Sequence, residues 1–332
     1  MPKKITALLL AAVMLFSFSG CEFFDRLYDM HLKGEQKESS SLPEEESFPE
    51  LTEADPNWPV TVCNTEIAAM PQKVAAASPA LVEYISDLGL LSRLCAACDF
   101  CAFSKEAEAL PSVGSPSLPD FDSIKSAEPE YILTLAEYDE ASLIKLQQMN
   151  ITVLVFSSPK TFDELRALYK ELALFFLGAE EGAAAGEAFM QKYNAALDET
   201  AYSGEKSTAL FLRGMDNIVI TGDSLGGEIL SRCFVNAAGE ASGFEYPADD
   251  FSDLKPDIIF VGGTVRLKDL ENSDLYRKKS AVKNDRVFLA DLDALNIASL
   301  RALSVAKDMM ATAYEDYSGG TKLEVAYPSI YQ

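Results

Sequence analysis

The sequence has almost no histidine: His31 is the only one in 332 residues. It lies in a polar N-terminal stretch that lacks the apolar content of a folded segment. Ser-His-Asp and Cys-His catalytic sets both need a histidine in the folded body, as does a histidine-ligated metal site. We therefore expect no catalytic residues of these kinds, no metal site and no resident cofactor.

Basic residues are also scarce. The chain has 28 Lys and Arg against 52 Asp and Glu, a formal charge of −24. Such a surface repels the phosphates of nucleic acids and anionic lipid head groups. The sequence therefore excludes nucleic acid as an expected partner, and any membrane attachment needs a covalent anchor.

Cysteine is sparse but clustered. Besides Cys21 the chain has five cysteines: Cys63, Cys95, Cys98, Cys101 and Cys233. The C-x2-C-x2-C run from Cys95 to Cys101 is part of the bacterial ferredoxin pattern, but the segment 102–105 lacks the fourth cysteine. Cys95 and Cys98 also lie on a predicted strand, where their odd separation directs them to opposite faces. An iron–sulfur or zinc site is disfavoured, and a disulfide to Cys63 or Cys233 stays open.

The N-terminus predicts the compartment. Residues 1–20 combine a basic start, an apolar core from Ile5 to Phe18 and small residues before Cys21, which is typical of a secretory signal. The ending Phe-Ser-Gly-Cys resembles a bacterial lipobox, although Phe18 replaces the usual aliphatic residue, and it implies a lipid on Cys21. Residues 21–58 are rich in Glu, Ser and Pro and indicate a disordered acidic tether. The protein is predicted to be extracytoplasmic and anchored to the cell membrane.

The remaining chain predicts two α/β lobes joined by a helix. Apolar residues recur at helical spacing from Thr161 to Phe176, Gly178 and Gly182 interrupt the pattern, and a second helix follows from about 180 to 199. We interpret it as a linking helix over 180–200 between a lobe at 59–179 and a lobe at 201–318, with an extension at 319–332. A surface helix packed on one larger domain is the alternative.

Short apolar runs alternate with helical patterns in both lobes. The predicted strands are 60–63, 73–77, 94–98, 131–135 and 151–156, then 208–213, 217–221, 257–261 and 286–290. This alternation indicates mostly parallel, Rossmann-like sheets with right-handed crossovers. Ligands of such sheets bind at the carboxyl ends of the strands.

Several segments resemble the extracytoplasmic binding proteins of ABC importers for vitamin B12, ferric siderophores and haem. In the first lobe these are KVAAASPALVEYISDLGLLSRLCAACDFC, LPSVGSPSLPDFDSIKSAEPEYIL and LIKLQQMNITVLVF; in the second they are IVITGDSLGGEILSRCFVNAAGE, LKPDIIF and SDLYRKKSAVKNDRVFLAD. The resemblance covers roughly residues 59–317. It implies two α/β lobes bridged by one long helix, with a shallow ligand cleft between them.

The resemblance also implies a set of ligand-binding residues. These are Ser78, Pro79, Asp99, Phe100, Cys101, Phe103, Ser115 and Tyr138 from the first lobe, and Arg213, Asp223, Ser224, Thr264, Arg266 and Arg301 from the second. The aromatic members offer flat apolar surface to a macrocycle or chelate. Arg213 and Arg301 either neutralise acidic groups of a ligand or pair with neighbouring carboxylates.

Family members dock on the permease through one acid per lobe, usually Glu, and the matching residues are Asp122 and Asp249. Each lies seven residues before a proline that starts a buried strand, Pro129 or Pro256. The aspartates also suit the start of a short helix, where a negative charge is favourable. Asp120 or Asp250 is an alternative docking acid.

These features predict a monomeric substrate-binding lipoprotein that delivers a corrinoid, or else a ferric siderophore or haem, to an ABC permease and its ATPase. A lipid-anchored enzyme is disfavoured by the missing nucleophile–base set. A metal-ion receptor is disfavoured because such a site needs histidines with carboxylates. A surface adhesin is the remaining rival.

Overall fold

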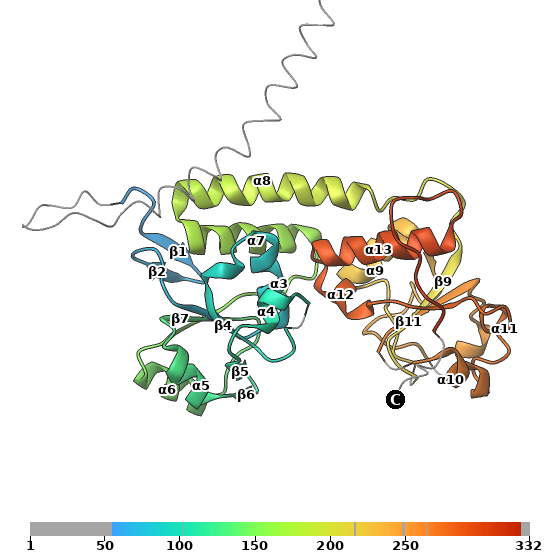
Figure 1. Ribbon diagram of the computed structural model, residues 1–332, viewed down its shortest axis with the longest axis horizontal. Helices are drawn as coiled ribbons and strands as arrows, with labels where there is room; N and C mark the ends of the chain where they lie inside the picture. Colours follow the sequence, from blue (N-terminus) through green and yellow to red (C-terminus); the bar gives the residue numbers. More distant parts are fainter. Residues whose placement is uncertain (1–54, 102, 216, 248–249, 264, 327–332) are drawn as a thin grey trace, which may run out of the picture. The chain divides into compact units, whose positions relative to one another are not determined.

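Two four-stranded parallel sheets organise the protein (Figure 1). The computed structural model describes residues 55–101, 103–215, 217–247, 250–263 and 265–326. The mostly parallel α/β architecture predicted from the sequence is confirmed. Cys21, Asp249 and Thr264 lie outside the described residues, as do the signal peptide and most of the tether.

The N-terminal lobe is built on the sheet β4-β3-β7-β8, in which all neighbours are parallel. Its strands are β3 (Val74–Ala76), β4 (Leu94–Ala97), β7 (Tyr131–Thr134) and β8 (Thr152–Val155). Its helices include α3 (Pro79–Asp87), α4 (Lys105–Glu108), α5 (Phe121–Ala127) and α6 (Glu140–Gln148). Two hairpins complete it, β1 (Val60–Val62) with β2 (Thr65–Ile67), and β5 (Gly114–Ser115) with β6 (Leu118–Pro119).

The C-terminal lobe repeats this plan with the parallel sheet β10-β9-β11-β12. Its strands are β9 (Thr208–Leu212), β10 (Val235–Asn236), β11 (Ile258–Val261) and β12 (Val287–Leu289). Its helices are α9 (Leu225–Cys233), α10 (Leu267–Asn272), α11 (Ser280–Lys283), α12 (Leu292–Ile297) and α13 (Leu300–Ala313), with a 3-10 turn at Phe251–Asp253.

The strand predicted over 217–221 is wrong. This segment folds back on the end of β9, where Val219 forms only an isolated antiparallel bridge to Leu212. The fourth strand of the sheet is instead the two-residue β10, which is too short to leave a pattern in the sequence. The start of the C-terminal extension lies beside β12, where Val325 bridges Phe288 in antiparallel orientation.

The helical stretch in the middle of the chain consists of α7 (Phe162–Leu177) and α8 (Ala179–Asp198), packed along each other (Figure 1). Gly178, with φ of 82°, separates them, as the sequence predicts. Gly182 does not interrupt α8. A Cβ there would lie 2.6 Å from the carbonyl oxygen of Ala173, so this glycine allows the close approach of α7. None of the helices in the described part of the chain has both the length and the apolar character of a membrane span.

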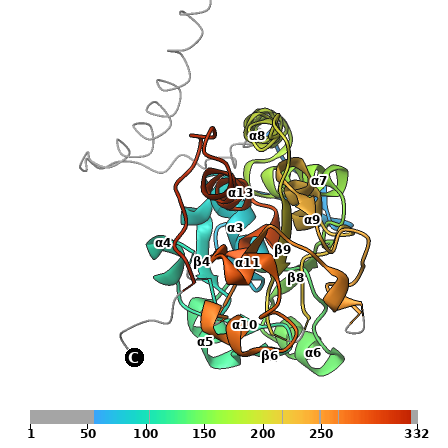
Figure 2. The same ribbon diagram turned by 90° about the vertical axis from the view of Figure 1, so that its right-hand side faces the viewer.

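Alternating side chains give each sheet two buried faces. On β9, Phe211 faces a large cluster that also includes residues of α7, α8, α9 and α13, whereas Leu210 faces the opposite side. Val74 and Ala75 of β3 divide in the same way. The large cluster contains residues of both lobes, and Figure 2 shows α13 beside α8. The lobes therefore share one continuous hydrophobic core.

Candidate ligand-binding site

The carboxyl ends of β3 and β7 are held together by Ser78. Its Oγ accepts a hydrogen bond from the Leu135 N–H (3.0 Å) and lies 3.5 Å from the Thr134 hydroxyl. Ser78 is the N-cap residue of α3, but its side chain makes no hydrogen bond to the start of that helix. Pro79 is the first residue of α3. Both predicted site residues thus lie at a strand end, but the buried Ser78 hydroxyl serves the fold.

The loop after β4 contains four predicted ligand-binding residues. Cys98 and Cys101 form a disulfide, and both are buried. Between them, the exposed Asp99 accepts a hydrogen bond from the Ser112 hydroxyl (2.5 Å), and Phe100 is 94% exposed. Phe103 packs against the shared core. Asp99 and Phe100 are therefore accessible to a ligand, whereas the Cys101 sulfur is buried in the disulfide.

The neighbouring β5–β6 hairpin holds Ser115, whose Oγ accepts a hydrogen bond from the Leu118 N–H (3.2 Å). Leu118 itself is 77% exposed. Tyr138 is only 4% exposed, and burial raises the pKa of its hydroxyl to about 12. The prediction that Tyr138 offers an open flat surface is therefore wrong, because its ring packs in the core between the sheet, α5 and α6.

In the C-terminal lobe, the predicted residues bind their own neighbours. Arg213, just after β9, forms an ion pair with Asp293 (2.8 Å). Asp223 accepts hydrogen bonds from the Thr221 hydroxyl and the Gly243 N–H, and these lower the pKa of its carboxyl. Ser224 caps α9 by accepting from the Gly227 N–H (3.0 Å). Arg266 precedes α10 and donates to the carbonyl oxygens of Gly263 and Val265.

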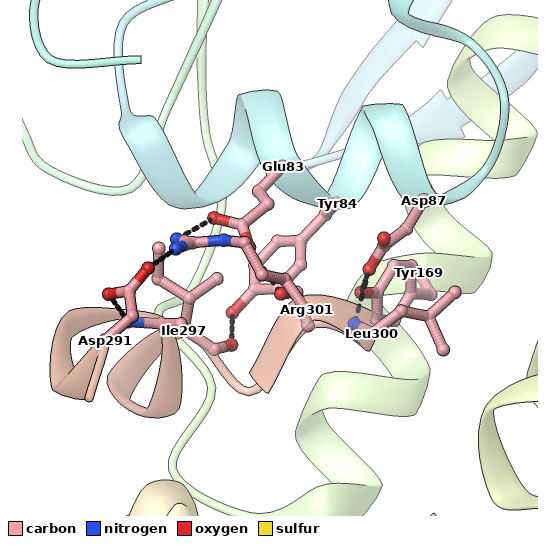
Figure 3. Close-up of polar contacts among 10 residues, drawn as sticks. Glu83, Tyr84, Asp87, Tyr169, Asp291, Ile297, Leu300 and Arg301 are labelled. Carbon is pink, nitrogen blue, oxygen red and sulfur yellow. Dashed lines mark hydrogen bonds and ion pairs between the residues drawn. The ribbon is translucent and has the colours of Figure 1, made fainter. Parts of the chain in front are cut away.

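Arg301 belongs to a polar cluster that joins the two lobes (Figure 3). Its Nε and Nη2 donate to the two carboxylate oxygens of Glu83 on α3, at 2.8 and 2.9 Å, and it also pairs with Asp291. The Ser299 hydroxyl donates to the same carboxylate (2.5 Å). Glu83 is 2% exposed. The sequence allows Arg301 either to neutralise acidic groups of a ligand or to pair with neighbouring carboxylates. In the structure Arg301 pairs with neighbouring carboxylates.

The chain just before Arg301 is held by three further side chains. Tyr84 donates to the Ile297 carbonyl oxygen (2.5 Å), and Tyr193 of α8 donates to that of Ala298 (2.6 Å). Asp87 accepts from the Tyr169 hydroxyl (2.7 Å) and from the Leu300 N–H (2.9 Å) (Figure 3). We call these contacts with residues 297–301, including those of Glu83, the lobe clasp.

The Asp87 carboxyl carries a pH dependence. Burial raises its pKa from 3.8 to about 6, against the two hydrogen bonds that favour the charged form. Between pH 4 and 6 the folded protein therefore holds a proton that the unfolded chain has released, so this group makes the free energy of unfolding fall as pH rises through that window. Two pKa units correspond to about 3 kcal/mol at most.

Asp87→Asn should remove this contribution, because an amide oxygen still accepts a hydrogen bond but does not titrate. We expect the free energy of unfolding of the variant, relative to wild type, to rise by about 1–3 kcal/mol between pH 4 and 7. Urea denaturation across that range measures it. Tyr169→Phe removes the hydrogen bond from the Tyr169 hydroxyl, which stabilises the charged Asp87 carboxylate. It should therefore raise the pKa of Asp87 further and extend to higher pH the range over which the free energy of unfolding falls. A constant difference between Asp87→Asn and wild type would contradict the assignment.

No group of three or more His, Cys, Asp and Glu side chains in the described ranges has a geometry for holding a metal ion. Among the described residues, the predicted site presents the exposed carboxylate of Asp99 and one exposed aromatic side chain, Phe100, in the loop at the carboxyl end of β4. This arrangement suits the reversible binding of a solute.

Comparison with known proteins decides the family. A family model described as periplasmic binding protein matches residues 74–294, more than half of the chain. The chain belongs to the periplasmic binding protein family. Its homologues bind solutes and are not enzymes, and the family is extracytoplasmic.

The relatives of this periplasmic binding protein are distant. The Fe(3+)-citrate-binding protein YfmC of Bacillus subtilis is 25% identical over 188 residues, which cover 55% of this chain and 60% of that protein, less than two thirds of its length. The vitamin B12-binding protein of Yersinia pestis is 25% identical over 201 residues, covering 59% of this chain and 71% of that protein.

Solved structures share the fold of this periplasmic binding protein. The vitamin B12 binding protein BtuF of Vibrio cholerae has a TM-score of 0.55 at 21% identity, covering 73% of this chain and 96% of that chain. The heme-binding protein RhuT from Roseiflexus has a TM-score of 0.62 at 16% identity, covering 75% and 100%. At these identities the likeness establishes the fold.

The predicted docking acid Asp122 and its alternative Asp120 differ in their hydrogen bonds. Asp122 is exposed in the first turn of α5, and its carboxylate has no hydrogen bond or ion pair to another described residue. Asp120, the alternative, accepts from the Asp122 and Ser123 N–H groups as the cap of α5, which lowers the pKa of its carboxyl. A pocket of about 650 Å³ between α5 and α6 is lined in part by Asp122. Asp122 is thus the free acid of the two.

The lobe clasp was missed by reasoning from the sequence. Its signal was present in α3, where Glu83 and Asp87 lie four residues apart on one side of the helix. Two like charges at that spacing destabilise an isolated helix. Their presence among apolar residues of α3 indicates that partners elsewhere in the chain bind them.

Proposed function

We propose that this chain is the substrate-binding component of an ABC importer and that it delivers a corrinoid nutrient to its permease. The family membership supports the transport role. Asp99 and Phe100 follow the carboxyl end of β4 and Arg213 follows that of β9, and the exposed Phe100 offers a flat apolar surface there. Phe100 is the observation on which the ligand class rests.

The charges of the site favour a corrinoid over ferric citrate. Arg213 and Arg301, which would neutralise ligand carboxylates, are bound to Asp293 and to Glu83 with Asp291. Asp99 adds a negative charge beside Phe100. Binding a polyanionic chelate would require breaking these pairs, whereas a macrocycle with uncharged amide side chains would not. Ferric siderophore or haem is the second candidate, because relatives named for iron citrate and heme share the family.

The proposal includes the rest of the transport machinery. Cys21 would carry the lipid anchor at the end of the acidic tether, and the protein would work as a monomer with a permease and its ATPase. The strongly acidic chain supports a covalent anchor, since its charge of −24 disfavours direct contact with anionic lipid.

A ligand panel tests the function. We expect cyanocobalamin to bind with a Kd of about 1 µM or tighter, and ferric citrate and haemin to bind at least about 10-fold more weakly, read by visible absorbance and native mass spectrometry. Phe100→Ala should weaken cyanocobalamin binding by about 10-fold, the worth of one stacked aromatic contact. The matched control is Tyr131→Ala, which changes a partly buried aromatic residue at the amino end of β7, opposite the carboxyl ends of the strands, and should leave the Kd unchanged. Tighter binding of haemin or ferric citrate would overturn the ligand class.

A further inference from the structure

The Phe100 side chain is held in an unfavourable position. It is a large apolar residue with 94% of its surface in water, and its φ of 65° lies in the left-handed region that non-glycine residues rarely occupy. Neither the exposure nor the backbone conformation stabilises the loop. The surrounding structure must therefore impose both.

Two constraints flank Phe100. The Cys98–Cys101 disulfide closes a ring with only Asp99 and Phe100 between the cysteines, with Cα atoms 6.3 Å apart. Both cysteines are buried, so the ring is attached to the core on both sides of the exposed pair. The second constraint is the bond from the Ser112 hydroxyl to Asp99 (2.5 Å).

Ser112 is itself fixed to the sheet. The Ala97 N–H donates to the Pro111 carbonyl oxygen (2.9 Å), and the Val113 N–H donates to that of Ala97 (2.8 Å). These two hydrogen bonds pair residues 111–113 with the end of β4. The chain then enters the β5–β6 hairpin, which carries the exposed Leu118. Asp99, Ser112 and Leu118 also line one surface pocket of about 590 Å³. The disulfide ring and the hairpin thus form one rigid unit with two exposed apolar side chains.

We propose that the Cys98–Cys101 disulfide is a positioning element of the ligand site, which fixes Phe100 in its exposed conformation before the ligand arrives. The inference rests on the proposed function, because it assigns the ligand as the partner of the Phe100 ring. Prior fixing of a contact residue increases affinity, since binding then has less conformational freedom to remove.

The other cysteines do not compete for this disulfide. Thiol–disulfide exchange needs a thiolate. Burial raises the pKa of the Cys63 and Cys233 thiols to about 12 and raises that of Cys95 as well. An added dithiol opens the ring in two exchanges. One dithiol thiolate attacks one cysteine sulfur, breaks the Cys98–Cys101 bond and releases the other cysteine as a thiolate, which takes up a proton. The second dithiol thiolate then attacks the dithiol sulfur of the mixed disulfide and releases the remaining cysteine, so the products are two cysteine thiols and the oxidised, cyclic dithiol.

A double-mutant cycle tests the proposal with cyanocobalamin and haemin as probes, read by absorbance titration. The Cys98→Ser/Cys101→Ser variant should raise the Kd of the bound probe about 5- to 10-fold. The same pair of changes made in the Phe100→Ala background should alter Kd less than twofold, because the disulfide acts on binding through the Phe100 phenyl ring, which this background lacks. Cys95→Ser, which changes a thiol on the same strand, should leave Kd unchanged. Equal effects of the disulfide loss in both backgrounds would mean a general structural role and would overturn the proposal.

A ligand-independent measurement separates this inference from the proposed function. In hydrogen exchange of the wild-type protein, dithiothreitol should accelerate exchange in the peptides carrying Ala97 and Val113, whose N–H groups donate backbone hydrogen bonds beside the loop, and leave peptides of α3 unchanged. If neither probe binds the wild type, the proposed ligand class fails, and the exchange result still decides whether the disulfide holds the loop. Unchanged exchange at Ala97 and Val113 after verified reduction would refute the positioning role.

Discussion

Replacing Glu83 by alanine should lower the free energy of unfolding by about 3–5 kcal/mol, the usual cost of removing one partner of a buried ion pair. Glu83 is 2% exposed and receives two bonds from Arg301 and one from Ser299. Without it, the Ser299 hydroxyl and two guanidinium nitrogens lose their acceptor. Equilibrium urea denaturation measures the effect.

Changes at Arg301 distinguish the loss of the Glu83–Arg301 ion pair from the loss of side-chain packing. Arg301→Met leaves the Glu83 carboxylate buried without its main partner and should cost about as much as Glu83→Ala. The double variant Glu83→Leu/Arg301→Met replaces the pair by apolar side chains. We expect it to be at least about 2 kcal/mol more stable than the summed effects of Glu83→Leu and Arg301→Met, each measured alone, would predict. Lys73, which pairs with Glu128 at the surface, provides a control: Lys73→Met should cost less than about 1 kcal/mol. Additive single effects would show that the pair is not coupled.

The parallel sheets were predictable because buried strands and helices leave different periodicities. β3, β7 and β11 are short runs of apolar residues flanked by helix signals, and each appears within a residue or two of its expected place. β10 was not predictable. It has two residues, one of them the exposed Val235, and it exists because the chain after α9 is pulled against β9 by tertiary contacts.

The candidate site was predictable in part for a similar reason. A loop at the end of a parallel strand is marked by local sequence, so Asp99 and Phe100 were placed correctly at such an end. The lobe clasp depends on pairs that lie between 105 residues apart (Tyr193 with Ala298) and 218 residues apart (Glu83 with Arg301) in the sequence. The sequence left a disulfide to Cys63 or Cys233 open, whereas the structure pairs Cys98 with Cys101 and leaves Cys63 and Cys233 free. Spacing alone could not predict this pairing, because a disulfide is fixed by the distance and direction of the Cβ atoms.

Charge reversal at the two docking acids should reduce uptake by at least about 10-fold while leaving ligand affinity unchanged. In the Asp122→Lys/Asp249→Lys variant, a positive charge replaces each acid that the family resemblance places against permease arginines. Juxtaposed like charges at an interface cost several kcal/mol, mostly through slower and wrongly oriented encounter. Asp122 is suited to this contact because it is exposed and its carboxylate has no partner among the described residues. Uptake of labelled cyanocobalamin by cells, together with its Kd for the purified variant, measures the two effects.

Two matched variants show whether the position or the charge matters. Glu181→Lys/Glu240→Lys changes the net charge by the same amount at exposed residues of other elements and should leave uptake within about twofold of wild type. Asp122→Glu/Asp249→Glu restores the longer side chain typical of the family, so it should retain or raise uptake, since the carboxylate then reaches one methylene further. Equal loss of uptake in both lysine variants would point to net charge alone. Undiminished uptake in Asp122→Lys/Asp249→Lys would instead move the docking contact to other acids, of which Asp250 is the nearest in sequence to Asp249.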